Sequence, residues 1–199
     1  MNKISKPFLS LILVSIAALL VWHLEKPTQE KTGDVLNKLF LPNLNTQNVV
    51  TIQIEHLVNG VKLKKENGEW LATDMKTKLR DNIEKGTPSA TEWKEDWQKI
   101  DSSKVAIALD TFQNLQSISL AGDNPTKHGY FEVNPVGRQV SLYDAAGKEL
   151  AHLYLGKMGA GFAESYIRKE GENNVYMTDK FLRPLFPANA EGWKETPQK

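Results

Sequence analysis

The four histidines are the first residues to weigh for chemistry, because imidazole serves as a metal ligand and as a general base. No two of them stand four residues apart, which is the helical spacing that zinc peptidases use. They are His23, His56, His128 and His152. The spacing predicts surface or partly buried histidines and no metal site.

Nucleophilic chemistry has equally weak support. The chain contains no Gly-x-Ser-x-Gly elbow and no cysteine, so neither a serine hydrolase motif nor thiol catalysis is indicated. Ser102-Ser103-Lys104 reads better as the start of a helix than as a Ser-Lys dyad. We therefore expect a protein without enzymatic activity or cofactor.

The run Gly156-Lys157-Met158-Gly159-Ala160-Gly161 is a candidate ligand loop, because successive backbone N–H groups in a glycine-rich loop can hold an anion. A nucleotide-binding loop needs its glycines before a Gly-Lys-Ser/Thr that opens a helix, and here Gly-Lys comes first. A hairpin loop is the main interpretation, and a ligand contact through Gly156, Gly159 and Gly161 is the alternative.

Trp93 and Trp97 are candidate partner contacts. They stand four residues apart in a charged segment, where aromatic side chains one helical turn apart can anchor a partner protein. Packing into the core is the other interpretation.

The first 26 residues have the composition of a membrane segment. Lys3 and Lys6 precede an uncharged, mostly apolar run from Phe8 to Leu24, which as a helix reaches roughly 25 Å, near the lower limit for crossing a bilayer. The apolar residues that would form this anchor include Phe8, Leu11, Leu13, Ile16, Leu19, Leu20 and Trp22. The lysines before the run predict a cytoplasmic N-terminus and an exported remainder.

Two other interpretations of this segment stay open. Ser15-Ile16-Ala17 is a small-x-small triplet that a signal peptidase could accept, although the cut would fall inside the apolar run. A buried core helix is the third, but such a helix normally carries a polar face. An anchor and a cleaved signal both place the domain outside the cytoplasm, whereas a core helix does not.

The balance of charge argues against a nucleic acid as partner. The chain has 25 Lys and Arg against 24 Asp and Glu, and removing the N-terminal segment leaves the rest nearly neutral. A nucleic-acid binder would show a basic face or stripe. The absence of cysteine also excludes disulfides and lipoprotein acylation.

Alternating apolar residues predict a mostly antiparallel sheet. We expect a helix at residues 34–41, a three-strand meander with turns at Asn59-Gly60 and Asn67-Gly68, and one main helix beginning at Ser102 or Ser103. The further strands are expected at Ser117–Ala121, Tyr130–Val133, Gln139–Asp144, Glu149–Leu155, Ser165–Lys169 and Asn174–Thr178, followed by a short helix at Phe181–Phe186.

These elements predict an α+β fold, with a mostly antiparallel β-sheet, one main packed helix and a single transmembrane helix before it. The expected domains are a membrane anchor at 1–26, a tether at 27–33, an extracytoplasmic domain at 34–187 with a charged insertion at 74–100, and a polar C-terminal tail at 188–199.

The order of segments resembles the bacterial domain of unknown function 4340 family over about Leu36 to Phe186. The resemblance rests on an ordered series: Leu39-Phe40-Leu41-Pro42, Val49 to Ile54, Gly68 with Trp70, Val140 to Asp144, Gly147-Lys148, Leu155-Gly156-Lys157, Tyr166-Ile167-Arg168 and Val175-Tyr176. Many relatives are longer and repeat the unit, whereas this chain has one copy, and the segment with Trp93 and Trp97 matches nothing in them.

The resemblance implies a membrane-anchored protein of the bacterial inner membrane whose domain faces the periplasm. Some relatives resemble accessory components of gliding-motility-type ABC transporters. We therefore expect a binding or scaffolding accessory subunit with an envelope protein partner, and the resemblance implies a subunit of an ABC-type transport system as that partner. The alternative is a periplasmic module that binds an apolar or glycan ligand, with the loop from Gly156 to Gly161 as its lid.

Overall fold

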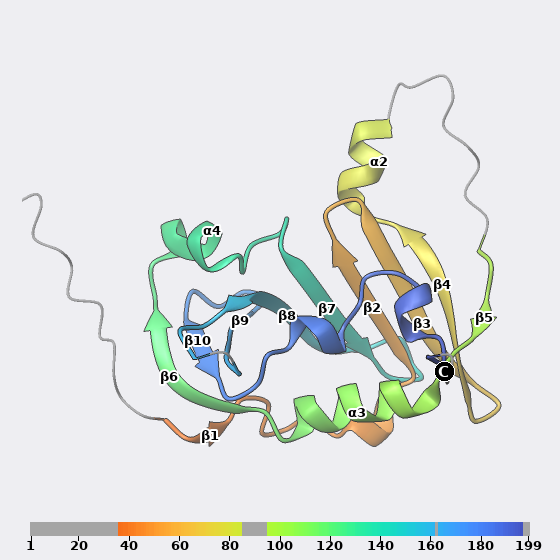
Figure 1. Cartoon of the computed structure of the whole chain (residues 1–199), viewed down its shortest axis with the longest axis horizontal. Helices are drawn as coiled ribbons and strands as arrows, with labels where there is room; N and C mark the ends of the chain where they lie inside the picture. Colours follow the sequence, from red (N-terminus) through yellow and green to blue (C-terminus); the bar gives the residue numbers. More distant parts are fainter. Residues whose placement is uncertain (1–35, 85–94, 162, 197–199) are drawn as a thin grey trace, which may run out of the picture. The chain divides into compact units, whose positions relative to one another are not determined.

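One ten-stranded antiparallel sheet organises the molecule (Figure 1). The computed structural model describes residues 36–84, 95–161 and 163–196. The strand order is β1-β6-β10-β9-β8-β7-β2-β3-β4-β5, and every pairing is antiparallel. The fold is therefore α+β with a mostly antiparallel sheet.

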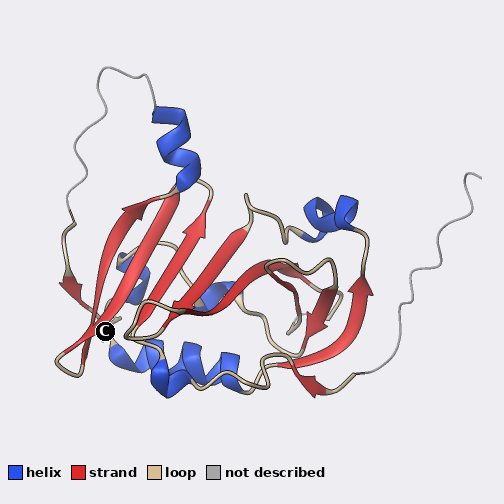
Figure 2. Ribbon diagram, turned by 180° about the vertical axis from the view of Figure 1, so that it is seen from behind, coloured by secondary structure: helices blue, strands red, loops and turns tan. Residues whose placement is uncertain are grey.

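The element bounds follow the alternation of apolar residues closely. The strands are β1 (Lys38–Leu39), β2 (Thr51–His56), β3 (Asn59–Glu66), β4 (Glu69–Lys76), β5 (Gln98–Lys99), β6 (Gln116–Gly122), β7 (Arg138–Tyr143), β8 (Glu149–Met158), β9 (Ser165–Lys169) and β10 (Val175–Thr178). The helices are α2 (Lys78–Glu84), α3 (Ser102–Gln113) and α4 (His128–Phe131), with 3₁₀ turns at Thr46–Asn48, Pro125–Lys127, Arg183–Leu185 and Glu191–Trp193. Figure 2 shows α3 along the lower ends of the strands and α2 and α4 at the upper ends.

The main core lies between one face of the sheet and α3. Ile52 and Ile54 of β2 are fully buried there together with Phe112 of α3, because apolar residues at alternate strand positions meet the apolar stripe of the helix. The opposite face carries Thr51, Gln53 and Glu55, and it is this face that bears the polar side chains considered below.

The start of α3 is close to its predicted position. Asp101, rather than Ser102 or Ser103, is the cap: its carboxylate accepts the N–H of Ser103 at 2.9 Å. Aspartate satisfies a free N–H at a helix start as well as serine does. The predicted buried stripe of this helix is confirmed at Val105, Ala108, Leu109 and Phe112.

Two predicted elements near the sheet edge are wrong. The stretch expected as a helix at 34–41 contains the short strand β1, where Leu36 and Phe40 donate backbone hydrogen bonds to Ile118 and Leu115. Pairing with β6 places Phe40 in the core, which an isolated surface helix could not do. The stretch Tyr130–Val133, expected as a strand, begins in helix α4.

The first hairpin turn also differs from its prediction. The turn residues are Leu57 and Val58, and Asn59 and Gly60 belong to β3. This register sets Ile52 opposite Leu63 and Ile54 opposite Val61, whereas a turn at Asn59-Gly60 would have set a lysine opposite Ile54. Apolar cross-strand pairing therefore prevails over the preferred turn dipeptide.

The C-terminal segment is not a polar tail. Ala188, Ala190 and Trp193 are buried in the main core, and the Trp193 indole N–H donates to the carbonyl of Pro187 at 3.0 Å. The expected tail at 188–199 is thus corrected as far as residue 196. Its small apolar residues and one tryptophan are too few for a periodic signal.

The predicted insertion at 74–100 is only partly separate from the sheet. Its first residues extend β4 to Lys76, and β5 returns to pair with β4 at Leu71 and Ala72. Residues 85–94 lie outside the described part, and so do the predicted membrane anchor at 1–26 and the tether at 27–33. Across the described ranges, no helix is both long and apolar enough to cross a membrane.

Candidate functional site

Strands β8 and β9 separate at one end, and this separation creates the candidate site. Their register begins at Leu153 opposite Lys169, and the last ladder bond runs from the N–H of Glu170 to the carbonyl of His152 at 2.9 Å. Gly171 then adopts a positive φ of 78° and turns the chain away. The first residues of β8 are left beside an opening.

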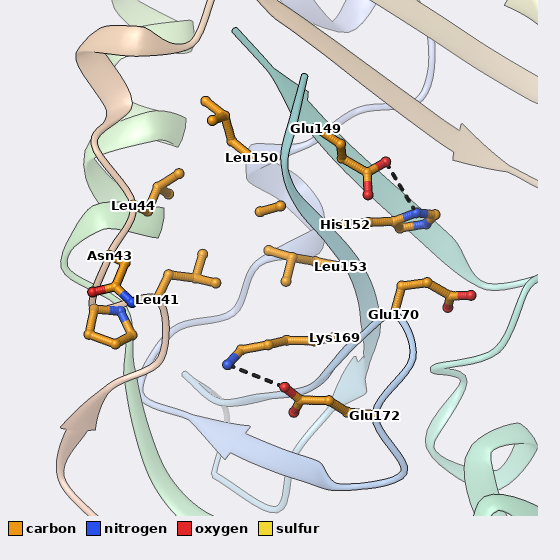
Figure 3. A pocket seen from close by; sticks show the side chains of 12 residues that line it. Leu41, Asn43, Leu44, Glu149, Leu150, His152, Leu153, Lys169, Glu170 and Glu172 are labelled. Atoms are coloured by element: carbon orange, nitrogen blue, oxygen red, sulfur yellow. Dashed lines mark ion pairs between the residues drawn. The ribbon is translucent and has the colours of Figure 1, made fainter. Parts of the chain in front are cut away.

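The first cavity fills this opening and has a volume of about 410 Å³ (Figure 3). The loop at 41–44 forms one wall, and β8 and β9 form the other. The apolar lining includes Leu41, Leu44, Leu150 and Leu153. The charged lining comes from Glu149, Lys169, Glu170 and Glu172, and His152 adds a polar ring. A cavity with an apolar wall and a charged rim can hold a ligand that has both characters.

Ionisable side chains at this cavity lie next to one another in pairs. Lys169 Nζ lies 3.6 Å from Glu172 Oε1, and His152 Nδ1 lies 3.7 Å from Glu149 Oε2 (Figure 3). His152 Nε2 is 3.2 Å from Gln139 Oε1. Both ring nitrogens of His152 therefore have a neighbour that restrains the ring.

Ser141 stands directly opposite His152 in the register of β7 and β8, so the set Ser141, His152 and Glu149 has the composition of a catalytic triad. Its geometry is different. A serine nucleophile needs its hydroxyl hydrogen-bonded to the histidine, but Ser141 hydrogen-bonds to the Tyr143 hydroxyl and His152 faces Gln139. These side chains can bind polar groups, and they are not arranged to activate a nucleophile.

The second cavity lies on the polar face of the sheet and has a volume of about 500 Å³. It shares Glu149, His152 and Glu170 with the first. Its floor comes from β2, β7 and β8, where the register aligns Gln53 with Ser141 and His152, and Glu55 with Gln139 and Tyr154. The full lining is Gln53, Glu55, Leu57, Leu79, Asn82, Pro135, Val136, Gln139, Ser141, Tyr143, Glu149, His152, Tyr154 and Glu170.

The floor of the second cavity holds a neutral phenol beside an ionised carboxylate at neutral pH. Burial and the neighbouring Glu170 carboxylate raise the pKa of Tyr154 to about 12, and the Tyr154 hydroxyl in turn lowers the pKa of Glu170. The Arg168 guanidinium lies over the Tyr154 ring, 4.1 Å from its centroid. This arrangement fixes the Tyr154 ring in place.

Arg168 is itself anchored from several directions. It is buried, and it donates hydrogen bonds to the carbonyls of Val133, Lys169 and Glu172 at 2.9 to 3.2 Å. Its planar, multiply donating guanidinium suits these three acceptors in a way that a lysine ammonium would not. Arg168 therefore serves as a structural support beneath the cavity floor.

Within the described residues, no three His, Asp or Glu side chains are grouped so that they could hold a metal ion. Of the other histidines, His128 Nε2 lies 2.9 Å from the carbonyl oxygen of Asn173. Burial lowers the pKa of His56, with Arg138 and Arg183 adding to the effect.

Trp97 immediately precedes the edge strand β5 and is half-buried. Lys64 Nζ lies 4.3 Å from the centroid of its ring, and its indole N–H donates to Glu95 Oε2 at 3.0 Å. Trp97 thus packs on the polar face near the sheet edge rather than in the main core. Trp93, its predicted companion, falls outside the described residues.

The glycine loop forms hydrogen bonds with its own glutamate. The N–H of Gly161 donates to Glu164 Oε2 at 2.9 Å, and the N–H of Gly159 donates to the Glu164 carbonyl at 3.1 Å. Gly156 lies inside β8, where a Cβ atom would come within 2.5 Å of the Phe131 carbonyl oxygen. The structure places these glycines outside the linings of the cavities at β8, on the polar face and beside Trp193.

Apart from His152, the sequence did not single out the residues of the second cavity. They are the polar members of three alternating strands, and that pattern is also the ordinary one for a solvated sheet face. Only strand order brings Gln53, Gln139 and Tyr154 together, since β2 and β8 flank β7 despite the sequence between them.

Comparison with known proteins confirms the family resemblance but changes its bounds. A family model described as "Domain of unknown function (DUF4340)" matches residues 93–197, which is just over half of the chain. The match begins at residue 93, so it includes Trp93 and Trp97, which were expected to match nothing in the family, and it does not extend over residues 36–92. Searches of curated proteins and of solved structures gave no significant match. The matched range contains α3, β6 to β10 and the buried C-terminal segment. The chain belongs to the DUF4340 family.

Proposed function

We propose that the chain is a non-enzymatic, single-pass protein of the bacterial inner membrane that works as a binding or scaffolding accessory subunit. Residues 1–26 anchor it with the N-terminus in the cytoplasm, and the α+β domain faces the periplasm. The proposal draws its location from the apolar N-terminal run and from the family resemblance. The proposed partner is an envelope protein, in the first place a subunit of an ABC-type transporter.

The observation that carries the binding role is the position of Trp97. The edge strand β5 has only two residues, so the sheet ends here in a short strand. Lys99, the second residue of β5, forms an ion pair with Glu69 at 2.6 Å. An aromatic side chain amid charged groups at the end of a sheet has the composition of a contact hot spot, because tryptophan buries a large area and charged neighbours form the polar rim.

The test is affinity purification of the full-length, C-terminally tagged protein from its native membranes in mild detergent. Trp97→Ala should reduce recovery of a stoichiometric partner at least about tenfold, as expected for a hot spot worth 1.4 kcal/mol or more. Tyr130→Ala is the matched control, since Tyr130 is an aromatic residue, 67% exposed, on helix α4. Equal recovery with Trp97→Ala would remove this surface from the proposal.

Topology has its own test. Fusion of alkaline phosphatase to the C-terminus should give an active enzyme, because that enzyme matures only outside the cytoplasm. Green fluorescent protein fused to the same C-terminus should not fluoresce, because the general secretion route would export it unfolded. The opposite pair of results would contradict a periplasmic domain.

A second candidate function is a periplasmic module that binds an apolar or glycan ligand. The first cavity favours it, because leucines line one wall and paired charges form the rim. A ligand that binds only the folded state raises the melting temperature by mass action. A thermal-shift screen of glycans and lipids against the full-length protein tests it, and Leu150→Gln should abolish any shift that arises in this cavity.

A further inference from the structure

The turn between β2 and β3 consists of Leu57 and Val58, two apolar residues that are uncommon in tight turns. Leu57 has a positive φ of 55°, a conformation that asparagine or glycine adopts more readily, and its side chain is 47% exposed. Val58 beside it is 39% exposed. The strand register fixes the position of this turn, but neither of its two side chains is buried in the core. Backbone strain of this kind gathers at functional sites.

Other exposed apolar residues gather around the same cavity. Leu57 lines the second cavity together with Leu79 of α2 and with Pro135 and Val136 of the loop before β7. Val136 is 50% exposed. Three separate segments thus form an apolar rim around one opening.

Below this rim the cavity is acidic. Glu55, Glu149 and Glu170 line it, and among the described lining residues there is no lysine or arginine. Glu170 lies 3.8 Å from the Arg168 guanidinium beneath the floor, and Glu149 lies 3.7 Å from His152. Glu55 has no ion-pair partner in the described part of the chain, and it stands opposite Gln139 in the register of β2 and β7. Carboxylates enclosed by apolar walls attract a cation more strongly than exposed carboxylates do.

The rim and the floor together select the occupant. A free metal ion or a small amine would use the Glu55 carboxylate and leave the apolar rim unused, and a purely apolar ligand would leave Glu55 without a partner. A peptide segment with aliphatic residues on either side of an arginine or lysine satisfies both. The basic side chain reaches Glu55 while its neighbours cover Leu57 and Val136.

We propose that the second cavity, with its rim of Leu57, Leu79 and Val136, is a docking site for a basic and aliphatic peptide segment of a partner protein. This proposal goes beyond the function proposed above, because it assigns a second contact surface that does not include Trp97. The two proposals can therefore fail independently.

The test uses the full-length protein in uncharged detergent micelles and a fluorescent, acetylated and amidated peptide of sequence Val-Leu-Arg-Leu-Val. Anisotropy should show binding above that of empty micelles, and rising salt should weaken it, because the charge pair is partly exposed to solvent. The same peptide with citrulline in place of arginine keeps the shape without the charge. It should bind about three- to tenfold more weakly, as expected for one partly screened pair.

Variants locate the binding. Glu55→Gln and Val136→Ser should each lower the affinity for the arginine peptide, and Glu191→Gln, a charge change on the C-terminal 3₁₀ turn, should not. The Glu55→Lys protein should bind the peptide Val-Leu-Glu-Leu-Val, in which glutamate replaces the arginine, more tightly than it binds the arginine peptide. Far-UV circular dichroism and the melting temperature confirm that each variant is folded. Trp97→Ala should bind the peptide normally, whatever it does to partner recovery.

Three outcomes overturn the proposal. One is that no peptide binds above the level of empty micelles. The second is that binding occurs but is indifferent to both Glu55→Gln and Val136→Ser. The third is that 1,5-diaminopentane competes as strongly as the arginine peptide and Val136→Ser has no effect, which would assign the cavity to a small amine.

Discussion

The rings of Phe112 and Phe186 stack with their centroids 4.2 Å apart and an angle of 18° between their planes. Both side chains are fully buried. Phe112 lies on the inward face of α3, and Phe186 lies in the segment after β10, so this contact joins the main helix to the C-terminal part of the chain. The C-terminal segment is therefore part of the core of the domain.

Phe186→Ala should destabilise the domain by about 3–5 kcal/mol, because the lost ring leaves a cavity beside Phe112 as well as losing its own burial. Chemical denaturation of the full-length protein in detergent, followed by tryptophan fluorescence, measures the loss. Phe181→Ala is the matched control, since Phe181 lies a few residues earlier and is exposed. A loss below 1 kcal/mol for Phe186→Ala would show that the C-terminal segment does not pack as described.

Tyr154 should make stability depend on alkaline pH. Its pKa in the folded state is raised from 10.0 to about 12, because burial and Glu170 disfavour the phenolate. The neutral form is therefore favoured by folding, so the contribution is complete below pH 10 and is lost as the pH rises from 10 through 12. The measurement is the denaturation midpoint of the wild type and of Tyr154→Phe over this range.

The difference between those two proteins isolates Tyr154 from lysines that titrate in the same range. Tyr154→Phe should show a shallower fall of stability above pH 10, and absorbance at 295 nm should lose one late-titrating tyrosine. Parallel curves for the two proteins would mean that Tyr154 ionises normally in the folded state.

Leu57→Asn should stabilise the domain by about 1 kcal/mol, because asparagine adopts a positive φ with less strain than leucine. The Leu57 carbonyl, which accepts a hydrogen bond from the Thr77 hydroxyl at 2.7 Å, is kept in the variant. Thermal denaturation tests this, with Leu57→Ala as the control that shortens the side chain without relieving strain. A loss of stability with Leu57→Asn would show that the leucine side chain contributes more to packing than its exposure indicates.

Gly156→Ala should destabilise the domain by about 1–3 kcal/mol, since the added methyl group would meet the Phe131 carbonyl at 2.5 Å and Val133 at 2.8 Å. Gly129→Ala serves as comparison, because the nearest atom to its added methyl lies 3.7 Å away. Differential scanning calorimetry of both variants separates crowding from the general effect of replacing glycine. Equal stability of the two variants would argue against a packing role for Gly156.

Sequence patterns predicted the strands well wherever apolar residues alternate over several positions. The strand Ser165–Lys169 is confirmed at both ends, and the buried stripe of the helix from 102 to 113 is confirmed residue by residue. Short or weakly periodic stretches were predicted poorly. At Tyr130–Val133, four residues are too few to distinguish a helical period from a strand period, and at 188–199 the apolar residues are too few to form any period.

The sequence by itself determined the antiparallel character of the sheet, the main helix and the family resemblance, since these depend on local alternation, on turn residues and on the order of segments. Tertiary structure alone decided the position of the Leu57-Val58 turn, because register depends on which apolar residues face each other across two strands. It also decided the acidic cavity, because Glu55, Glu149 and Glu170 are distant in sequence and meet only when β2, β7, β8 and β9 lie in order. Local patterns specify which side chains share a face, whereas strand order specifies which faces become neighbours.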